Sequence, residues 1–403
     1  MKVLIFNVNS HEGSTGMIAY NLLKYLREHG HKAKLLSGNV REDKIDDSDV
    51  ICLNNKVEYY GSVLLTRLLG YEGSYNYSAT CRAKKIIDDF NPNVVQFYGM
   101  HAYWINSYEI MEYTKEKKIP AVYSMLDEFP YLGKCAYALE CTKFQTECKN
   151  CPKWRQYPAT WFFDKSKKIF YRKKSIYDGY ENIVFTGPRW VIDRAGTSAL
   201  MKGQRLELLN EPINYDDAFY PRDASALRKE LGIPDGNKVV LTVAVMSNVR
   251  KGGKYFIEAA ERLKERKDIS FVFVGYNVNT PAPGNVITIP FVKSQDKLAE
   301  FMALGDVLVC TSLADTMPNV CLDALGCGTP LCGFAEKGTP FCAPEPIGVF
   351  TPTYDVDALV KCIVEFPFKT KIMSEACVKY AHENFDVKSV FKRLVSIYNG
   401  FVK

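Results

Sequence analysis

The stretch from Ser312 to Pro330 constrains the fold more than any other part of the chain. An apolar, strand-like run, Val307–Cys310, precedes it. Its second half, Val320–Leu325, has the composition of a buried helix and is ended by a glycine and a proline. A strand, a loop and a helix N-terminus in this order indicate a parallel α/β sheet. Because the first backbone N–H groups of a helix are unpaired and its dipole is positive there, the loop can hold a phosphate.

Two carboxylates flank this phosphate-binding loop. Asp315 precedes a Pro-Asn pair, and Asp323 stands eight positions later, one turn inside the predicted helix. Each carboxylate can accept hydrogen bonds from sugar hydroxyls on either side of a diphosphate, whereas the backbone N–H groups of Asn319 and Val320 face the phosphate itself. The layout therefore predicts a sugar nucleotide as ligand.

A basic element supports the same ligand. Val239–Met246 is a nearly continuous apolar run, as in a buried parallel strand, and it leads into Arg250 and Lys251. Helical spacing follows in Tyr255–Arg266. The two cations thus lie at the carboxyl end of a strand, where doubly wound sheets bind ligands, and they can neutralise a diphosphate leaving group.

Together these elements resemble the donor half of retaining GT-B glycosyltransferases of family 4, the glycosyl transferases group 1. That family has an Arg/Lys-Gly phosphate clamp, here Arg250-Lys-Gly252, and two glutamates with seven residues between them, the first followed closely by Pro-Asn. In this chain the spacing matches, but both glutamates are aspartates, Asp315 and Asp323. The alternative is a pair of ordinary helix-capping loops in a doubly wound sheet.

The resemblance implies an α/β fold of two Rossmann-like domains facing across a cleft, with a C-terminal helix returning to the first domain. Alternating apolar strands and helices fit this organisation in both halves. The predicted boundaries are an acceptor-side domain over 1–210 with a cysteine-rich insert at 133–152, a linker over 211–221, a nucleotide-sugar domain over 222–385 and the returning helix over 386–403.

The first half begins with a strand, Val3–Val8, and a helix, Ile18–Arg27, joined by a glycine-containing loop. Within this loop Gly13, Ser14, Thr15 and Gly16 offer backbone and hydroxyl donors. The pattern is not G-x-G-x-x-G, which disfavours a dehydrogenase-type dinucleotide fold. The resemblance implies that the loop faces donor and acceptor; the alternative is a helix-capping loop.

The strand that begins at Ala121 ends where family members usually carry a His-Asp pair whose histidine contacts the donor sugar. Here Leu126 stands at the histidine position and Asp127 is retained. Three explanations stay open: Asp127 or His101 takes over the role, the donor sugar lacks the matching hydroxyl, or activity is lost. His101 follows the predicted strand Val94–Phe97 and is the preferred active-site histidine; a structural loop histidine is the alternative.

Four cysteines, Cys135, Cys141, Cys148 and Cys151, lie within seventeen residues. The final C-x2-C-Pro has metal-knuckle spacing, and four thiolates would close a tetrahedral structural zinc site. Some bacterial members of the family carry a similar insert. An iron–sulfur cluster and four unlinked thiols remain the alternatives.

Composition limits the other options. The chain has 403 residues, thirteen cysteines and a net charge of +6, with no apolar run of membrane-spanning length and no signal-peptide core. These features predict a reduced, cytoplasmic protein in which thiols such as Cys52 and Cys310 pack as small hydrophobic groups. Nucleic-acid binding lacks a motif. The aromatic and basic segment 162–174 predicts either peripheral contact with an anionic inner-membrane face or a solvated helix that packs its aromatics inward.

The resemblance finally implies a reaction. A sugar moves from a nucleotide-diphosphate donor, UDP-linked, to a hydroxyl of a glycan or lipid-linked acceptor, with retention of configuration and without a divalent metal. Asp127, His101, Arg250, Lys251 and Asp315 are the catalytic candidates. Val292 is expected to contact the base through its backbone. A nucleotide-sugar epimerase or hydrolase and a non-catalytic sugar-nucleotide-binding paralogue are the rival functions.

Overall fold

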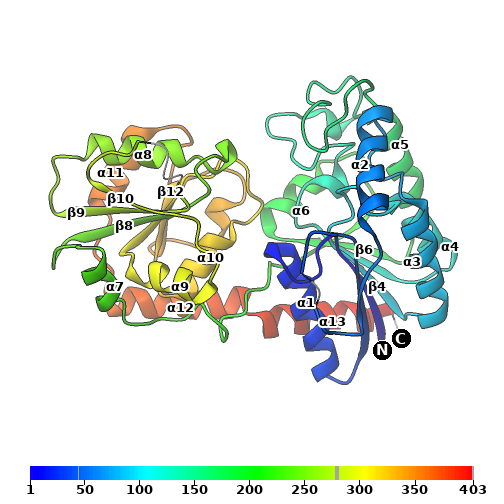
Figure 1. The fold of residues 1–403 in the computed structure, drawn as a ribbon, viewed down its shortest axis with the longest axis horizontal. Helices are drawn as coiled ribbons and strands as arrows, with labels where there is room; N and C mark the ends of the chain where they lie inside the picture. Colours follow the sequence, from blue (N-terminus) through cyan, green and yellow to red (C-terminus); the bar gives the residue numbers. More distant parts are fainter. Residues whose placement is uncertain (44, 277–280, 402–403) are drawn as a thin grey trace. The chain divides into compact units, whose positions relative to one another are not determined.

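A computed structural model of the protein describes residues 1–43, 45–276 and 281–401. The chain divides into two compact units, Met1–Glu211 with Val390–Lys403, and Pro212–Ser389. Each unit is a parallel sheet with helices packed on it (Figure 1). No helix among the described residues is long and apolar enough to span a bilayer.

The first unit contains a seven-stranded sheet of order β3-β2-β1-β4-β5-β6-β7. Its strands are β1 Lys2–Phe6, β2 Lys32–Ser37, β3 Val50–Cys52, β4 Val94–Phe97, β5 Ala121–Ser124, β6 Ile183–Gly187 and β7 Arg205–Leu208. Its helices are α1 Gly13–Glu28, α2 Lys56–Leu69, α3 Tyr77–Phe90, α4 Ser107–Glu116, α5 Ser166–Tyr177, α6 Arg189–Gly196 and, from the chain's other end, α13 Val387–Phe401.

The second unit contains a six-stranded sheet of order β10-β9-β8-β11-β12-β13. Its strands are β8 Lys238–Val243, β9 Ile269–Val274, β10 Val286–Ile289, β11 Val307–Cys310, β12 Leu331–Phe334 and β13 Gly348–Thr351. Its helices are α7 Ser225–Glu230, α8 Gly253–Arg262, α9 Gln295–Leu304, α10 Asn319–Gly326, α11 Val356–Glu365 and α12 Lys371–Phe385.

These two sheets confirm the predicted pair of Rossmann-like domains. All strand pairs are parallel, and every residue of β4, β9 and β11 is buried, which explains their continuous apolar runs. In both units the strand order reverses beside the first strand, between β1 and β4 and between β8 and β11. Such switch points place neighbouring loops at one end of the sheet, where ligands bind in this fold class.

The C-terminal helix α13 belongs to the first unit, as predicted. Alternation along β4 sends Val95 and Phe97 into the unit's main apolar core, whereas Gln96 points to the opposite face. There its Oε1 accepts a 2.7 Å hydrogen bond from Tyr398 of α13. The ring of Phe391 lies 5.5 Å from that of Tyr25 in α1. The helix therefore completes the first unit's core.

Three local expectations need correction. Helix α1 begins at Gly13, so Gly13–Gly16 form its first turn and not the loop before it. Cys52 ends the edge strand β3 and is exposed, whereas Cys310 is buried as expected. The segment 162–174 divides in two: α5 packs Phe170 inward, but Phe162 precedes the helix and is 63% exposed.

Candidate functional site

The clamp of the second unit lies at the end of β8. Arg250 and Lys251 stand in a 3-10 turn, Val249–Lys251, that is closed by Gly252 with φ +67°. A Cβ on Gly252 would stand 1.9 Å from the carbonyl oxygen of Thr311, which follows β11. Only glycine fits this approach of the two loops. The fold thus brings the basic loop against the acidic one.

Asp315, in the loop after β11, holds both cations. Its Oδ2 accepts a 2.8 Å hydrogen bond from the Lys251 ammonium, and its Oδ1 lies 3.5 Å from the Arg250 guanidinium, which also donates to the carbonyl of Ala314 at 3.0 Å. The prediction that this carboxylate binds sugar hydroxyls stays a prediction; in the structure the carboxylate pairs with both cations of the clamp. Both cations keep more than a quarter of their side chains exposed, so they remain open to an anion.

A third loop, which follows β12, also contacts the loop that carries Asp315. The sequence did not predict this contact. The N–H of Gly338 donates to the carbonyl of Asp315 at 3.0 Å, and a Cβ on Gly338 would stand 1.5 Å from the carbonyl oxygen of Thr316. Loops from the adjacent strands β8, β11 and β12 therefore meet around one carboxylate and two cations.

The remaining donor-side candidates lie on three elements. Asn319 and Val320 open α10, whose N-cap, Pro318, supplies no side-chain hydrogen bond. Asp323, inside α10, is buried, and burial raises the pKa of its carboxyl group well above the ordinary value. Among the described residues no hydrogen-bond partner of this carboxyl group is found. Val292 lies in the loop between β10 and α9, packed on the unit's core.

The first unit brings His101 and Asp127 together, although they follow different strands, β4 and β5. His101 Nε2 lies 2.6 Å from Asp127 Oδ2, and His101 Nδ1 lies 3.0 Å from the hydroxyl of Tyr157. Asp127 Oδ1 accepts a hydrogen bond from the N–H of Phe129 at 2.8 Å, which fixes the carboxylate. Of the three explanations for Leu126, this pairing favours replacement of the usual histidine by His101.

Charge makes this pair a proton-binding group. Burial alone lowers the pKa of His101, but the charge and hydrogen bond of Asp127 and the charge of Glu72 outweigh burial and raise it above its usual value. Glu72 is completely buried, and burial raises the pKa of its own carboxyl group. The imidazole therefore holds a second proton more readily than a free histidine does.

Glu72 also fixes the backbone beside the histidine. Its Oε1 accepts a hydrogen bond from the N–H of Ala102 at 3.0 Å, whereas its Oε2 has no partner among the described residues. Ala102 and Tyr103 both have positive φ, 76° and 71°, which is unfavourable for residues with a Cβ. Strain of this kind collects at functional sites. Neither Glu72 nor Tyr157 stands in a pattern that sequence reasoning could have singled out.

The loop after β1 is organised by a carboxylate that was also not predicted. Glu42 accepts hydrogen bonds from the N–H groups of Ser10 at 2.7 Å and Glu12 at 2.9 Å. Beside it, a cavity of about 550 Å³ at the carboxyl ends of β2 and β3 is lined by polar residues, among them Asn39 and Asn54, and by apolar residues such as Val40 and Val50. In the first turn of α1, Gly16 is buried against Asn9. The N-cap of α1, Glu12, supplies no side-chain hydrogen bond to the first turn of the helix.

The four cysteines lie in one largely irregular segment. Burial, together with the charges of neighbouring thiols, raises the pKa of Cys135 to about 12, and burial raises that of Cys148 to about 11. A Cβ on Gly133 would stand 2.7 Å from the Cβ of Cys148, so the chain packs closely here. No disulfide joins them. Among the described residues no three metal-ligand side chains are gathered closely enough to hold an ion.

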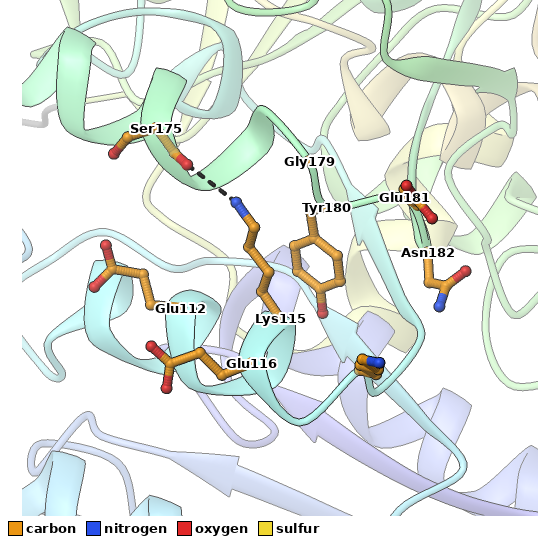
Figure 2. A pocket seen from close by; sticks show the side chains of 9 residues that line it. Glu112, Lys115, Glu116, Ser175, Gly179, Tyr180, Glu181 and Asn182 are labelled. Carbon is orange, nitrogen blue, oxygen red and sulfur yellow. Dashed lines mark hydrogen bonds between the residues drawn. The ribbon is translucent and has the colours of Figure 1, made fainter.

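A second cavity of the first unit, about 740 Å³, contains none of the predicted residues (Figure 2). Its central lysine, Lys115, donates to the carbonyl oxygens of Ser175 at 3.1 Å and Ile176 at 2.9 Å. The lysine thus caps the C-terminus of α5, and the cavity is structural.

Comparison with known proteins agrees with this architecture. The fold is that of GT-B glycosyltransferases, and residues 237–366 match the family model described as "Glycosyl transferases group 1". This match covers the clamp, Asp315 and Asp323. The comparisons thus support a glycosyltransferase.

One protein of similar sequence and two of similar structure illustrate what the chain resembles. A protein of Escherichia coli (strain K12), named as a colanic acid biosynthesis glycosyl transferase, WcaC, is 22% identical over 343 residues, which is 82% of each chain. The structure of sucrose-phosphate synthase from Thermosynechococcus elongatus superposes with a TM-score of 0.69 at 13% identity, over 100% of this chain and 99% of the other. Anabaena HepE in complex with UDP-glucose gives a TM-score of 0.64 at 14% identity, over 99% and 100%.

Proposed function

We propose that the protein transfers a sugar from a nucleotide-diphosphate donor, UDP-linked, to a hydroxyl group of a glycan or lipid-linked acceptor. The observation that carries this proposal is the meeting of Arg250, Lys251 and Asp315 at the switch point of the second sheet. Two partly exposed cations at this place suit a diphosphate whose negative charge grows as it leaves. The UDP-glucose bound to HepE, on the same fold, supports the choice of donor.

We assign the other donor contacts to α10 and the β10–α9 loop. The N-terminus of α10, at Asn319 and Val320, assists in binding the phosphates. The carboxyl group of Asp323 binds the ribose, and the backbone at Val292 contacts the base. The first turn of α1, with Gly13, Ser14, Thr15 and Gly16, is a second anion-binding helix start.

We propose that transfer proceeds with retention and without a divalent metal. The acceptor oxygen bonds to the anomeric carbon on the face that the diphosphate leaves, the bond from carbon to phosphate oxygen breaks, and the departing diphosphate takes the acceptor proton. Cationic side chains then stabilise the leaving charge in place of a metal ion. Because the acceptor oxygen attacks the anomeric carbon directly, this reaction needs no side-chain nucleophile, and because the leaving phosphate takes the proton, it needs no side-chain base.

We assign acceptor-side chemistry to the first unit. The His101–Asp127 pair can hold a sugar or acceptor hydroxyl group in place by hydrogen bonding, while the proton passes to the departing diphosphate. The cavity at the carboxyl ends of β2 and β3 offers amide and hydroxyl groups of the kind that bind sugars. The relative named for colanic acid biosynthesis supports a polysaccharide as the eventual product.

Turnover of a panel of UDP-, GDP- and ADP-sugars tests the proposal, with and without acceptor. Transfer predicts acceptor-dependent release of one nucleoside diphosphate. Release without acceptor identifies a hydrolase, and a changed sugar still bound to its nucleotide identifies an epimerase. Tight nucleotide binding with no conversion of any donor identifies a non-catalytic paralogue.

We further propose a structural zinc ion bound by Cys135, Cys141, Cys148 and Cys151. The support is the C-x2-C spacing and the electrostatic influence of Cys148 and Cys151 on Cys135. The described residues form no preformed metal site. The ion would order the segment from which Tyr157 contacts His101. Elemental analysis should find one equivalent of zinc, and Cys148→Ser should lower the melting temperature. Iron would indicate a cluster, and a metal-free protein of unchanged stability would leave four unlinked thiols.

A further inference from the structure

Helix α2 buries polar side chains and exposes apolar ones, the reverse of the usual pattern for a surface helix. Among its fourteen residues it buries Tyr59, Ser62 and Thr66, whereas one of its two valines, one tyrosine and three of its four leucines are largely exposed: Val57, Tyr60, Leu64, Leu65 and Leu69. The exposed set recurs at helical spacing and forms one apolar stripe. Burying a serine and a threonine while exposing leucines is unfavourable in water, so this face is built to contact something other than water.

Three consecutive aromatic residues extend the stripe. Trp161, Phe162 and Phe163 are 45%, 63% and 48% exposed. They lie against the C-terminal end of α2: the N–H of Trp161 donates to the carbonyl of Arg67 at 2.7 Å, and a Cβ on Gly70 would stand 2.6 Å from the carbonyl oxygen of Phe163. The helix face and the aromatic residues are therefore adjacent, and we call them together the α2 surface; Figure 1 shows the helix α2 in the first unit.

The border of the α2 surface is cationic. Residues 153–174 contain eight basic residues and one acidic residue, Asp164, whose carboxylate oxygens accept the backbone N–H groups of Cys151 and Ser166. The Arg67 guanidinium lies 5.7 Å from the Trp161 ring centre, and the Lys168 ammonium lies 4.8 Å from the ring centre of Tyr71, just beyond α2. Three cations of this segment pair with carboxylates, namely Arg172 with Glu112, Lys167 with Glu147 and Lys174 with Asp178, and Lys173 is buried. The four basic residues that remain still give the border a positive excess.

We propose that the α2 surface binds the interface of an anionic lipid bilayer. Leucine and aromatic side chains can enter the headgroup region while lysine and arginine remain at the phosphates. Tryptophan and tyrosine are favoured at this depth, and each cation near an anionic surface adds attraction. A second copy of the chain is a poor occupant, because facing cationic borders repel each other. This proposal does not depend on the proposed transfer reaction.

Vesicle co-sedimentation of the full chain tests it, with phosphatidylcholine vesicles containing or lacking phosphatidylglycerol. The wild-type protein should bind the anionic vesicles, and raised salt should weaken this binding. The double substitution Leu64→Ser and Leu65→Ser should reduce binding by about tenfold or more. Both side chains are exposed, so an unchanged melting temperature should confirm that the variant folds.

The second unit offers a matched control. Phe368 and Ile372 are 50% and 80% exposed, so Phe368→Ser with Ile372→Ser removes similar apolar surface elsewhere. This control should bind vesicles as the wild type does. Absence of wild-type binding to anionic vesicles, or an equal loss in the control, would overturn the proposal. So would a dimer that Leu64→Ser and Leu65→Ser dissociates in a protein that binds no vesicles, since the α2 surface would then be a self-association interface.

Discussion

The two sheets share one topology but carry different chemistry at their switch points. In the second unit the loops after β8 and β11 bring Arg250 and Lys251 to Asp315, a group with partly exposed positive charge. In the first unit the loops after β4 and β5 bring His101 to Asp127, a mostly buried pair in which the charge and hydrogen bond of Asp127 help to raise the pKa of the imidazole. The same fold thus has one edge with partly exposed positive charge, the cationic edge, and one with a buried histidine–carboxylate pair, the histidine edge, and the loops make the difference.

The largest expected effect concerns the cationic edge. Lys251→Ala removes a charge that stabilises the leaving diphosphate, so transfer should slow by about 2–4 kcal/mol in activation free energy. Steady-state kinetics with the donor identified by the panel measures this. A matched control is Lys264→Ala, because Lys264 is an exposed lysine that pairs only locally, with Glu261. Equal transfer rates for Lys251→Ala and its control would show that the Lys251 charge does not stabilise the leaving diphosphate.

A second test asks whether the cationic edge depends on loop contact. In Gly252→Ala the new Cβ meets the carbonyl of Thr311 at 1.9 Å, and φ is unfavourable, so unfolding free energy should fall by about 3 kcal/mol or more. Gly236→Ala shares the positive φ, +84°, but meets nothing within 4 Å, and should cost only about 1 kcal/mol. Denaturant titration compares the two. Similar losses would show that the loops can separate at little cost.

The histidine edge is tested by pH. Because the folded-state pKa of His101 is raised, the stabilisation it supplies is complete below the unfolded pKa and disappears as pH rises through the folded value. Asp127→Asn should therefore lower the free energy of unfolding by about 1–3 kcal/mol at pH values below the pKa of free histidine. The loss should be smaller at alkaline pH, where the imidazole is neutral in both proteins. Thermal melts of both proteins across this range measure the difference. A constant loss at every pH would mean that Asp127 acts on the loop and not on the histidine charge.

The smallest expected effect concerns Asp323 in α10, where a substitution should change nucleotide affinity more than the stability of the fold. The Asp323 carboxyl group is buried and has no hydrogen-bond partner among the described residues, so Asp323→Asn should leave stability within about 1 kcal/mol of wild type. If the group binds ribose, nucleotide affinity should fall by about tenfold, with turnover at saturating donor little changed. Calorimetry measures the affinity. A large loss of stability with unchanged affinity would make Asp323 a structural residue.

The sequence predicted best what buried strands determine. Strands β4 and β11 have the expected bounds, because every residue in them is buried and apolar runs mark such strands directly. Helix α2 was not predicted, since Ser62 and Thr66 face inward and the leucines face outward, the reverse of the usual pattern. An outward apolar face cannot be told from an inward one without the fold.

For the candidate site, the sequence identified single residues but not most of their partners. His101 and Asp127 were each selected because they follow strands, yet their 2.6 Å contact depends on adjacent strands meeting at one edge. Tyr157 and Glu72 come from distant segments without a motif, so nothing in the sequence connects them to His101. Contacts between loops are set by tertiary structure, and spacing along the chain does not encode them.

The most direct test of this division of chemistry is calorimetric titration of UDP into the wild type, Lys251→Ala and His101→Gln. We predict that Lys251→Ala lowers UDP affinity by about tenfold or more, as for loss of a charge-assisted contact to phosphate. We predict that His101→Gln binds UDP as the wild type does while losing sugar transfer. Unchanged affinity in Lys251→Ala, together with a loss in His101→Gln, would contradict the account.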